Sequence, residues 1–353
     1  MARPVLVARR FLFFLITQVS EFIIVGHGLA GAVLAHRLLG RGKKVQVLDS
    51  EFPHSASEVS VGLVNPLIGP KLNPPEKIFE CLEENTLFFP QFEEAWGKSF
   101  YCPLLLHRIF ISEKQKNRWF ELKQDSKYKE FLGDFLHSEK CASIQIQAPF
   151  GAGITKRAFQ LDVAGFLTAS RKHLETIGAW CTSRYREDEW TEKNKIIFCE
   201  GFRVQENQLF NHLPFAPARG ETLRIKKGND RPISNGSWYL PYGSEQAIIG
   251  STWDHENLLC GPTNEGEKEI LKNCDFVPVQ SQQIEAKKSG VRSGTRDRNP
   301  IMGVHKKCKN RFLFNGFGSR GTSTIPYYSK WMADFVLGNQ PLPQQVNLSR
   351  FES

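Results

Sequence analysis

No two of the eight cysteines in this 353-residue sequence are spaced C-x-x-C, so it carries no zinc-like cysteine motif. In a chain of this length we interpret the cysteines as free thiols of a reducing compartment, and we expect a cytoplasmic protein. The apolar run at 11–19 is shorter than the roughly twenty residues of a membrane span, so we expect no stable membrane insertion. The sequence also lacks any block of about five or six like charges.

The overall composition is that of a globular protein, with 41% hydrophobic and 24% charged residues. Its length suits two intertwined domains. The net charge of +9 has two interpretations. It can attract nucleic acid, anionic membranes or acidic substrates, or it can be a basic surface without a partner.

The first twenty residues resemble a signal peptide, because basic residues precede the apolar run. No small-x-small cleavage site follows, and cleavage near Ser20 would fall at the first predicted strand. We therefore expect residues 1–20 to be a leader or an extension from a mis-set translation start.

A glycine-rich turn follows the first predicted strand. The sequence EFIIVG predicts a buried strand, the residues after it predict a helix, and KKVQVLDS predicts a second strand. Gly26, Gly28 and Gly31 have the spacing G-x-G-x-x-G: the first permits the turn, the second admits a pyrophosphate, and the third lets the helix pack closely. Asp49 lies at the position where an acidic residue of this motif hydrogen-bonds the ribose hydroxyls of a dinucleotide. His27 is interpreted as the variable residue of the motif.

This βαβ unit predicts dinucleotide binding, with a glycine turn that holds no ligand as the alternative. The motif does not separate NAD from FAD, since both present an ADP half to the turn. A second glycine turn before a helix, at 315–322, suits a flavin, because a helix dipole there can stabilise negative charge on the reduced ring.

The rest of the sequence predicts an α/β fold with an α+β substrate part. We expect a loop over 51–75, a helix over 76–97 broken at Pro90, and an amphipathic helix over 161–179. That helix has its apolar face at Val163, Phe166, Leu167, Leu174 and Ile177. A closing helix holds Pro326 in its first turn. Strand-like pieces between residues 219 and 254 predict an antiparallel sheet.

The predicted elements fall into two domains. The nucleotide-binding domain is assigned to residues 21–75, 155–205 and 292–345. A mostly antiparallel substrate-binding domain is inserted as residues 76–154 and 206–291.

Several of these motifs together resemble a known family. VGHGLAGAVLAHRLLGRGKKVQVLD, ASEVSVGLVNP, FCEG, GVRSGTRDRNPIMG and NGFGSRGTSTIP are similar to segments of the D-amino acid oxidase and glycine oxidase superfamily of FAD-dependent oxidoreductases. The resemblance covers about residues 21–340. VRSGTRDRNPIMG with GSRG looks most like the oxidase domain of the bifunctional enzyme that modifies the wobble uridine of tRNA. The resemblance implies a Rossmann-like FAD-binding domain of the GR2 type.

The resemblance also implies a reaction: hydride transfer from the carbon beside a substrate amine to flavin N5, followed by imine hydrolysis. The implied substrate is a small amine-carboxylate of the glycine, sarcosine or D-amino acid type. Ser293 stands where some relatives attach flavin through a cysteine, so we expect non-covalent FAD. No general base is expected, because hydride transfer from a neutral amine needs none at the Cα–H.

The FAD-binding positions implied by the resemblance lie in four segments. They are Gly26, Gly28, Leu29, Ala30, Gly31, Asp49, Ser50, Ser57, Ser60, Gly62, Leu63, Glu200, Gly201, Gly316, Gly318, Ser319, Gly321 and Thr322.

Three residues are expected to act on the substrate. Arg292 matches the family's carboxylate-binding position, where a guanidinium can pair bidentately. Tyr239 matches a tyrosine that hydrogen-bonds substrate, and Arg320 is expected to face flavin or substrate. Asp297 is interpreted as an ion-pair partner of one of four arginines: Arg292, Arg296, Arg298 or Arg320. Core or rim packing is expected for Tyr242, Trp253 and His255.

Other functions remain open at this stage. One is a flavoenzyme that removes a carboxymethyl group from a modified tRNA wobble uridine, although the partner methyltransferase domain is absent from the sequence. Another is an NAD-dependent dehydrogenase without flavin, and a third is a binding protein that kept the fold. The amine, the electron acceptor and the oligomeric state are not defined by the sequence.

Overall fold

A computed structural model describes residues 20–277, 279 and 283–352. The chain divides into two compact units. The first holds the residues up to Ser55, Gly165–Pro217 and those from Arg292 onward; the second holds Ala56–Ala164 and Ala218–Val291. Compared with the predicted boundaries, 56–75 and 155–164 belong to the second unit and 206–217 to the first. The predicted leader at 1–20 lies outside the described residues except for Ser20.

The first unit is built on a six-stranded sheet within the described residues, in the order β14-β15-β8-β1-β2-β7. Its strands are β1 (Phe22–Val25), β2 (Val45–Asp49), β7 (Trp180–Thr182), β8 (Lys195–Phe198), β14 (Ile301–Val304) and β15 (Arg311–Asn315). Neighbours are parallel except β14, which is antiparallel to β15. The carboxyl ends of β1, β2, β8 and β15 therefore meet at one edge, where open α/β sheets bind ligands.

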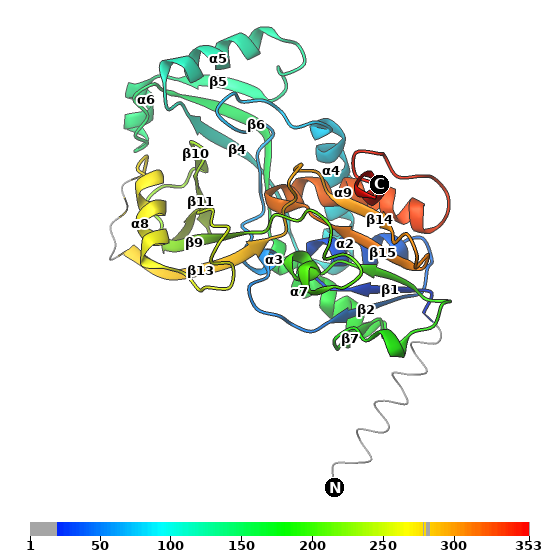
Figure 1. Ribbon diagram of the computed structural model, residues 1–353. Helices are drawn as coiled ribbons and strands as arrows, with labels where there is room; N and C mark the ends of the chain where they lie inside the picture. Colours follow the sequence, from blue (N-terminus) through cyan, green and yellow to red (C-terminus); the bar gives the residue numbers. More distant parts are fainter. Residues whose placement is uncertain (1–19, 278, 280–282, 353) are drawn as a thin grey trace. The chain divides into compact units, whose positions relative to one another are not determined.

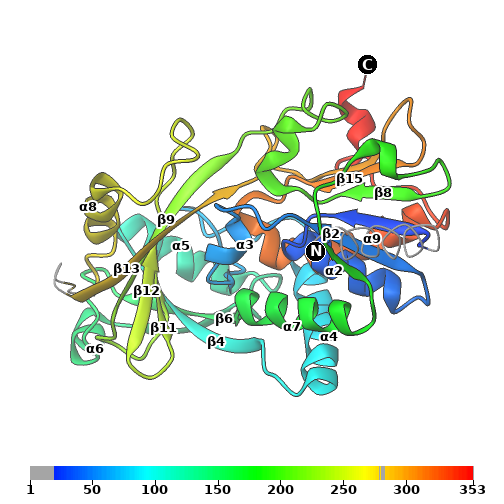
Figure 2. The same cartoon turned by 90° about the horizontal axis from the view of Figure 1, so that it is seen from below.

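Helices cover one face of this sheet. They are α2 (Leu29–Leu39), α7 (Val163–Thr176) and α9 (Gly321–Val336), and Figure 2 shows α2 and α9 side by side against the strands. The apolar side chains of α2 are buried, among them Leu29, Val33, Leu34 and Leu38. The opposite face packs on an irregular segment that contributes Trp190, Val204, Phe210 and Leu213.

The second unit contains a nine-stranded sheet within the described residues. The pairs β9–β12, β12–β11, β11–β10, β4–β6, β6–β3 and β5–β6 are antiparallel, and β10 pairs with β4 in parallel. The order is β13-β9-β12-β11-β10-β4-β6-β3, with β5 beside β6. The strands are β3 (Leu63–Val64), β4 (Tyr101–Ile109), β5 (Leu132–Leu136), β6 (Ala152–Leu161), β9 (Ala218–Lys226), β10 (Ile233–Ser234), β11 (Trp238–Tyr242), β12 (Gln246–Gly250) and β13 (Ile284–Arg292). Because β3 pairs with β6, the loop predicted at 51–75 joins this unit from Ala56 onward.

The helices of the second unit are α3 (Ala56–Val59), α4 (Ile78–Trp96), α5 (Glu113–Gln124), α6 (Ser138–Ser143) and α8 (Asn264–Asn273). Figure 1 shows α5 beside β5 and α8 beside β9, in agreement with their contacts. Among the helices that the structure describes, none is both long and apolar enough to cross a bilayer.

Three local predictions were wrong. Helix α4 runs unbroken through Pro90, because the buried Phe88 and Phe89 anchor it where a backbone hydrogen bond is lost. Pro326 lies beyond the first turn of α9, which begins at Gly321. Ile177 is 47% exposed, since α7 ends at Thr176 before the predicted apolar face is complete.

Candidate functional site: a dinucleotide-binding edge

The turn after β1 requires glycine at two positions because backbone approaches backbone there. Gly26 has φ +100°, and a Cβ on it would lie 2.6 Å from the carbonyl oxygen of Cys199. A Cβ on Gly31 would lie 1.9 Å from the carbonyl oxygen of Gly26. The first turn of α2 therefore packs directly on the ends of β1 and β8.

The amino end of α2 suits a phosphate. Gly28 is its N-cap residue and provides no side-chain cap, and the first turn contains no acidic residue. Leu29 is buried, while Ala30 is partly exposed. Backbone N–H groups and the helix dipole at this end attract a pyrophosphate.

Asp49, at the end of β2, fixes the geometry of this turn. Its carboxylate accepts hydrogen bonds from the backbone N–H of His27 at 2.5 Å and of Glu51 at 2.7 Å. Asp49 and the following Ser50 are both partly exposed. Each carboxylate oxygen keeps a further lone pair with which it can accept a ribose hydroxyl.

His27 has a defined structural partner, which the sequence analysis missed. Its Nε2 lies 2.9 Å from Ser170 Oγ, and His36 Nε2 lies 2.8 Å from the same oxygen. Burial lowers the pKa of both imidazoles to about 3, with smaller contributions from Arg171 for His27 and from His173 and His27 for His36. Both are therefore neutral at pH 7. Ser170 lies on α7, more than 130 residues away, and no local pattern links it to the turn.

Glu200 lies just after β8, next to the glycine turn. A Cβ on Gly26 would lie 3.4 Å from the Cα of Glu200. Glu200 Oε2 accepts a hydrogen bond from Asn207 Nδ2 at 2.8 Å, and burial raises the pKa of the carboxyl to about 7. Gly201 begins a 3₁₀ helix with φ +58°.

The second glycine turn follows β15 and is tied to the end of β8. Asn315 Oδ1 accepts the Gly316 N–H at 2.8 Å, and its Nδ2 donates to the carbonyl of Gly201 at 2.8 Å. Gly318 donates its N–H to the carbonyl of Ser293 at 2.8 Å. Ser319 is exposed, and Gly321 and Thr322 begin α9 partly exposed.

Ser293 adds an observation that fits a ligand at this turn. Its side chain is buried, and within the described residues its hydroxyl has no hydrogen-bond partner. Buried hydroxyls are normally satisfied, so an orphan beside a glycine turn indicates a missing partner group. The glycine cradle at Gly26 and Gly31 and this orphaned hydroxyl both fit a bound dinucleotide.

Arg292 ends β13 and is partly buried. Burial lowers the pKa of its guanidinium to about 10, so it stays positive at neutral pH. The next residue, Ser293, is bonded to the second glycine turn, and the backbone therefore links Arg292 to that turn.

The neighbouring charged residues have other partners. Asp297 pairs with Arg350 at 2.9 Å rather than with any of the four predicted arginines, because Arg350 comes back to this segment from the end of the chain. Arg320 donates to the backbone carbonyl of Arg298. Arg296 and Arg298 are exposed.

Tyr239 does not have the predicted geometry for substrate contact. Its side chain is fully buried in the core of the second unit. Its hydroxyl accepts the N–H groups of Gly228 and Asn229 and donates to the Asn229 carbonyl at 2.8 Å. The position that matched a substrate-binding tyrosine thus holds a tyrosine that fixes a turn.

Tyr242 and Trp253 are rim residues, at 43% and 53% exposure. Tyr242 lies over Arg224, and Trp253 Nε1 donates to His255 Nε2 at 2.7 Å.

The remaining predicted cofactor positions lie in the second unit. Gly62 has φ +67°, and a Cβ there would lie 1.9 Å from the carbonyl oxygen of Leu161. Its N–H donates to Ser60 Oγ at 3.2 Å, and Leu63 pairs with Gln160. Gly62 is therefore required by strand pairing within this chain. Ser57 lies on α3.

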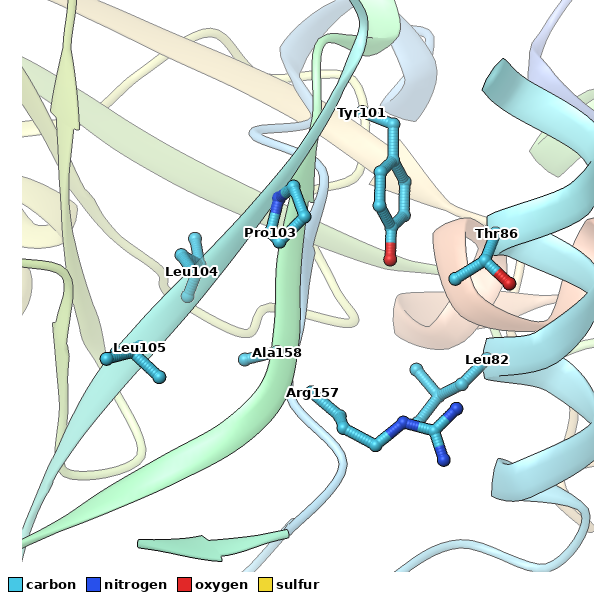
Figure 3. A pocket seen from close by; sticks show the side chains of 8 residues that line it. All are labelled: Leu82, Thr86, Tyr101, Pro103, Leu104, Leu105, Arg157 and Ala158. Atoms are coloured by element: carbon cyan, nitrogen blue, oxygen red, sulfur yellow. The ribbon is translucent and has the colours of Figure 1, made fainter. Parts of the chain in front are cut away.

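A cavity in the second unit is separate from these residues. It has a volume of about 370 Å³ and lies between α4, β4 and β6. Figure 3 shows Tyr101, Pro103 and Leu105 on one side, Leu82 and Thr86 on the other, and Arg157 reaching between them. The predicted cofactor and substrate residues do not line it.

The parallel sheet, the tight glycine turn and the acid after β2 together define a dinucleotide-binding protein of the Rossmann class. The chain matches the family of FAD dependent oxidoreductases (DAO) over residues 21–335 and belongs to that family. FAD is accordingly its cofactor.

Several known proteins are similar over most of the chain. The tRNA 5-methylaminomethyl-2-thiouridine biosynthesis bifunctional protein MnmC of Marinobacter nauticus is 23% identical over 94% of this chain. The bifunctional protein ThiO/ThiG of Trichormus variabilis is 22% identical, also over 94%. This chain covers 57% of the first protein and 56% of the second, so it spans little more than half the length of these relatives.

Solved structures share the fold. Glycine oxidase from Bacillus cereus superposes with a TM-score of 0.74 at 19% identity, over 91% of this chain and 96% of its own. Iminodiacetate oxidase from Chelativorans sp. BNC1 superposes with a TM-score of 0.77 at 15% identity, over 92% of this chain and 98% of its own. The predicted α/β fold with a Rossmann-like FAD-binding part is thereby confirmed.

Proposed function

We propose that this FAD-dependent oxidoreductase oxidises the C–N bond of a small amine that carries a carboxylate, of the glycine, sarcosine or D-amino acid type. The observation that carries the proposal is Arg292. Its guanidinium is partly buried, positively charged, and connected through Ser293 to the second glycine turn. A guanidinium in such a place binds a carboxylate bidentately.

The proposed roles divide between cofactor and substrate. The N–H groups of the Gly26–Gly31 turn hold the pyrophosphate, Asp49 holds the ribose, and Ser293 with the 316–322 turn holds the flavin end. FAD, when bound, accepts the hydride from the carbon beside the amine nitrogen. Arg292 orients the substrate by its carboxylate, and no side chain needs to remove a proton from that carbon.

We further propose that FAD is held without a covalent bond, since Ser293 rather than a cysteine follows Arg292. Acid precipitation of the yellow protein should then leave a colourless pellet and a yellow supernatant. A pellet that stays yellow after washing contradicts this.

Anaerobic flavin reduction tests the substrate class. Purified holoenzyme is mixed with glycine, sarcosine or a set of D-amino acids, and absorbance near the flavin maximum is followed. Bleaching by one of these amines supports the proposal. Yellow protein that none of them bleaches, under conditions where dithionite does, overturns it.

Replacement of Arg292 gives the sharper prediction. Arg292→Ala should raise KM about 100-fold, because a charge-assisted bidentate contact is lost, while FAD stays bound. The KM of Arg292→Lys should lie between those of the wild type and Arg292→Ala, because lysine keeps the positive charge but lacks the planar group that binds a carboxylate bidentately. The exposed Arg296→Ala is the matched control and should leave KM unchanged. Loss of FAD from Arg292→Ala would instead assign the residue to the cofactor.

A second function is favoured by the relatives named MnmC and by the net charge of +9. In it, the same flavin oxidises a carboxymethyl group on a modified tRNA uridine. Bleaching by such a tRNA, with no bleaching by free amino acids, favours this function. Its binding should weaken steeply with salt, as phosphate contacts do.

The alternative of an NAD-dependent dehydrogenase without flavin is wrong, because the family is FAD-dependent.

A further inference from the structure

Arg108, on β4, is a buried cation without a carboxylate partner in the part of the chain that the structure describes. Its side chain is 3% exposed. One guanidinium nitrogen donates to the Gly69 carbonyl at 3.3 Å, while Nε has no hydrogen-bond partner. Burial lowers the pKa of Arg108 to about 10, which leaves the group charged at neutral pH. A buried charge of this kind is costly unless an opposite charge compensates it.

Two further buried polar groups near Arg108 also lack partners within the described residues. Trp119, on α5, and Thr155, on β6, are both fully buried. The indole Nε1 of Trp119 and the hydroxyl of Thr155 make no hydrogen bond. An N–H donor and a hydroxyl that can donate are therefore left unsatisfied beside the guanidinium.

Strand register places the three groups on one face of the sheet. Arg108 lies directly opposite Gly153, and Leu106 lies opposite Thr155. Arg108 and Thr155 are thus diagonal neighbours, about 7–8 Å apart at their Cα atoms. A Cβ on Gly153 would lie 2.4 Å from Cε2 of Trp119, the atom bonded to Nε1. The indole therefore rests on Gly153 by the ring carbons next to Nε1, on the same face of the sheet as Arg108 and Thr155.

The loop at 69–71 packs against this region. Its three backbone carbonyls accept hydrogen bonds from side chains. The Gly69 carbonyl accepts one from Arg108, the Pro70 carbonyl one from Gln115 Nε2 at 3.2 Å, and the Lys71 carbonyl one from Arg118 Nε at 3.5 Å. The donors come from β4 and α5, so the loop is fixed to both elements. Arg108, Trp119 and Thr155 are each at most 3% exposed, so a ligand among them is enclosed by protein.

We propose that Arg108, Trp119 and Thr155 form a buried binding site for a small monovalent anion of chloride size. The ion accepts hydrogen bonds from Arg108 Nε, Trp119 Nε1 and the Thr155 hydroxyl, and it neutralises the guanidinium. It joins β4, β6 and α5, and its role is to stabilise the second unit. A neutral water molecule would satisfy the donors but would leave the charge uncompensated.

Thermal unfolding of the holoenzyme at constant ionic strength tests the proposal. Sodium gluconate is replaced stepwise by sodium chloride or bromide. The wild-type midpoint should rise by about 3 °C or more and then saturate, as a bound ligand requires. Arg108→Met should have a midpoint that does not depend on halide. Arg157→Met is the matched control: Arg157 is an exposed arginine of β6 paired with Glu130, and its variant should respond as wild type does.

Crystals soaked in bromide give a test that needs no variant. An anomalous peak within hydrogen-bond distance of Arg108 Nε and Trp119 Nε1 is the expected result. Water density without an anomalous peak overturns the proposal, and so does a halide effect on the midpoint that is the same in Arg108→Met.

Discussion

The backbone of Glu200 lies against the turn that we propose to hold the cofactor's phosphates, and the carboxyl's pKa of about 7 makes its charge sensitive to pH. When protonated it does not repel the diphosphate, and when ionised it does. We expect the FAD dissociation constant to rise between pH 6 and pH 8, by at most about tenfold per pH unit. Glu200→Gln should remove this dependence. Fluorescence titration of apoprotein with FAD measures both, and a flat wild-type profile would contradict the assignment.

Ser170 supports two neutral histidines at once. Ser170→Ala leaves two buried imidazole nitrogens without their shared partner, at a cost of about 1–3 kcal/mol for each unsatisfied group. We expect a lower free energy of unfolding and weaker FAD binding, because His27 belongs to the glycine turn. Urea titration and FAD fluorescence provide the measurements.

Ser329→Ala is the control for Ser170, since Ser329 is also fully buried in the first unit. Its hydroxyl donates to the Pro326 carbonyl within its own helix at 2.7 Å and accepts from Arg37 Nε at 3.4 Å, in the last turn of α2 and away from the glycine turn. Ser329→Ala should lower the free energy of unfolding but have little effect on the FAD dissociation constant. Equal effects of the two variants on the FAD dissociation constant would remove Ser170 from the support of the turn.

Single residues also mark what the sequence could not predict. Gly26, Gly31 and Asp49 follow a local pattern whose spacing carries its own geometry. Tyr239 matched a motif, but its hydroxyl is used by a turn at 228–229 whose position depends on tertiary packing. Asp297 pairs with Arg350, 53 residues away, and nothing near Asp297 indicates that choice.

The contact between α2 and the ends of β1 and β8 leaves no room for a methyl group. In Gly31→Ala the new Cβ would meet the Gly26 carbonyl at 1.9 Å, so the helix must move away from the strand. We expect protein without bound FAD, measured as loss of the visible flavin spectrum. Gly261→Ala, where a Cβ meets nothing within 4 Å, should keep FAD. A yellow, normally stable Gly31→Ala protein would show that the contact is not needed.

Among the helices and strands, predictions succeeded where the chain carries a clear local period. The strand at 22–25 and the helix at 29–39 follow from a buried apolar run and an amphipathic repeat. The break predicted at Pro90 was wrong because the cost of a proline inside a helix, about 3 kcal/mol, is smaller than the free energy gained by burying the aromatic side chains around it. The edge strand β3 has two residues and could not be separated from a loop before its pairing with β6 was known.

Acid should destabilise the whole protein. His27 and His36 have pKa values near 3 when folded and near 6.5 when unfolded, so unfolding takes up protons as pH falls through this window. Glu200 acts in the opposite direction between pH 4.5 and 7, because its folded pKa is raised. Between pH 6.5 and 4.5 these three groups give a net uptake of about one proton, which lowers the free energy of unfolding by about 1.4 kcal/mol per pH unit. Burial also lowers the pKa values of His107 and His305, which adds to the uptake.

Urea titrations at several pH values measure this slope. In Glu200→Gln the opposing contribution is absent, and the slope should increase by about 1.4 kcal/mol per pH unit, the contribution of one proton. Stability that is constant from pH 6.5 to 4.5 would contradict the buried, neutral state of the two histidines.

The order of strands in the first unit has a consequence for synthesis on the ribosome. Phe22 of β1 pairs with Lys195, 173 positions later, and Ile196 of β8 pairs with Arg311. Within this chain the glycine turn and β2 are made before β8, the other neighbour of β1, which emerges only after residues 56–164 of the second unit. Until then β1 exposes an apolar, β-branched edge, which favours pairing with other chains. Production of this flavoprotein should therefore depend on chaperones and on slow synthesis more than its final stability would suggest.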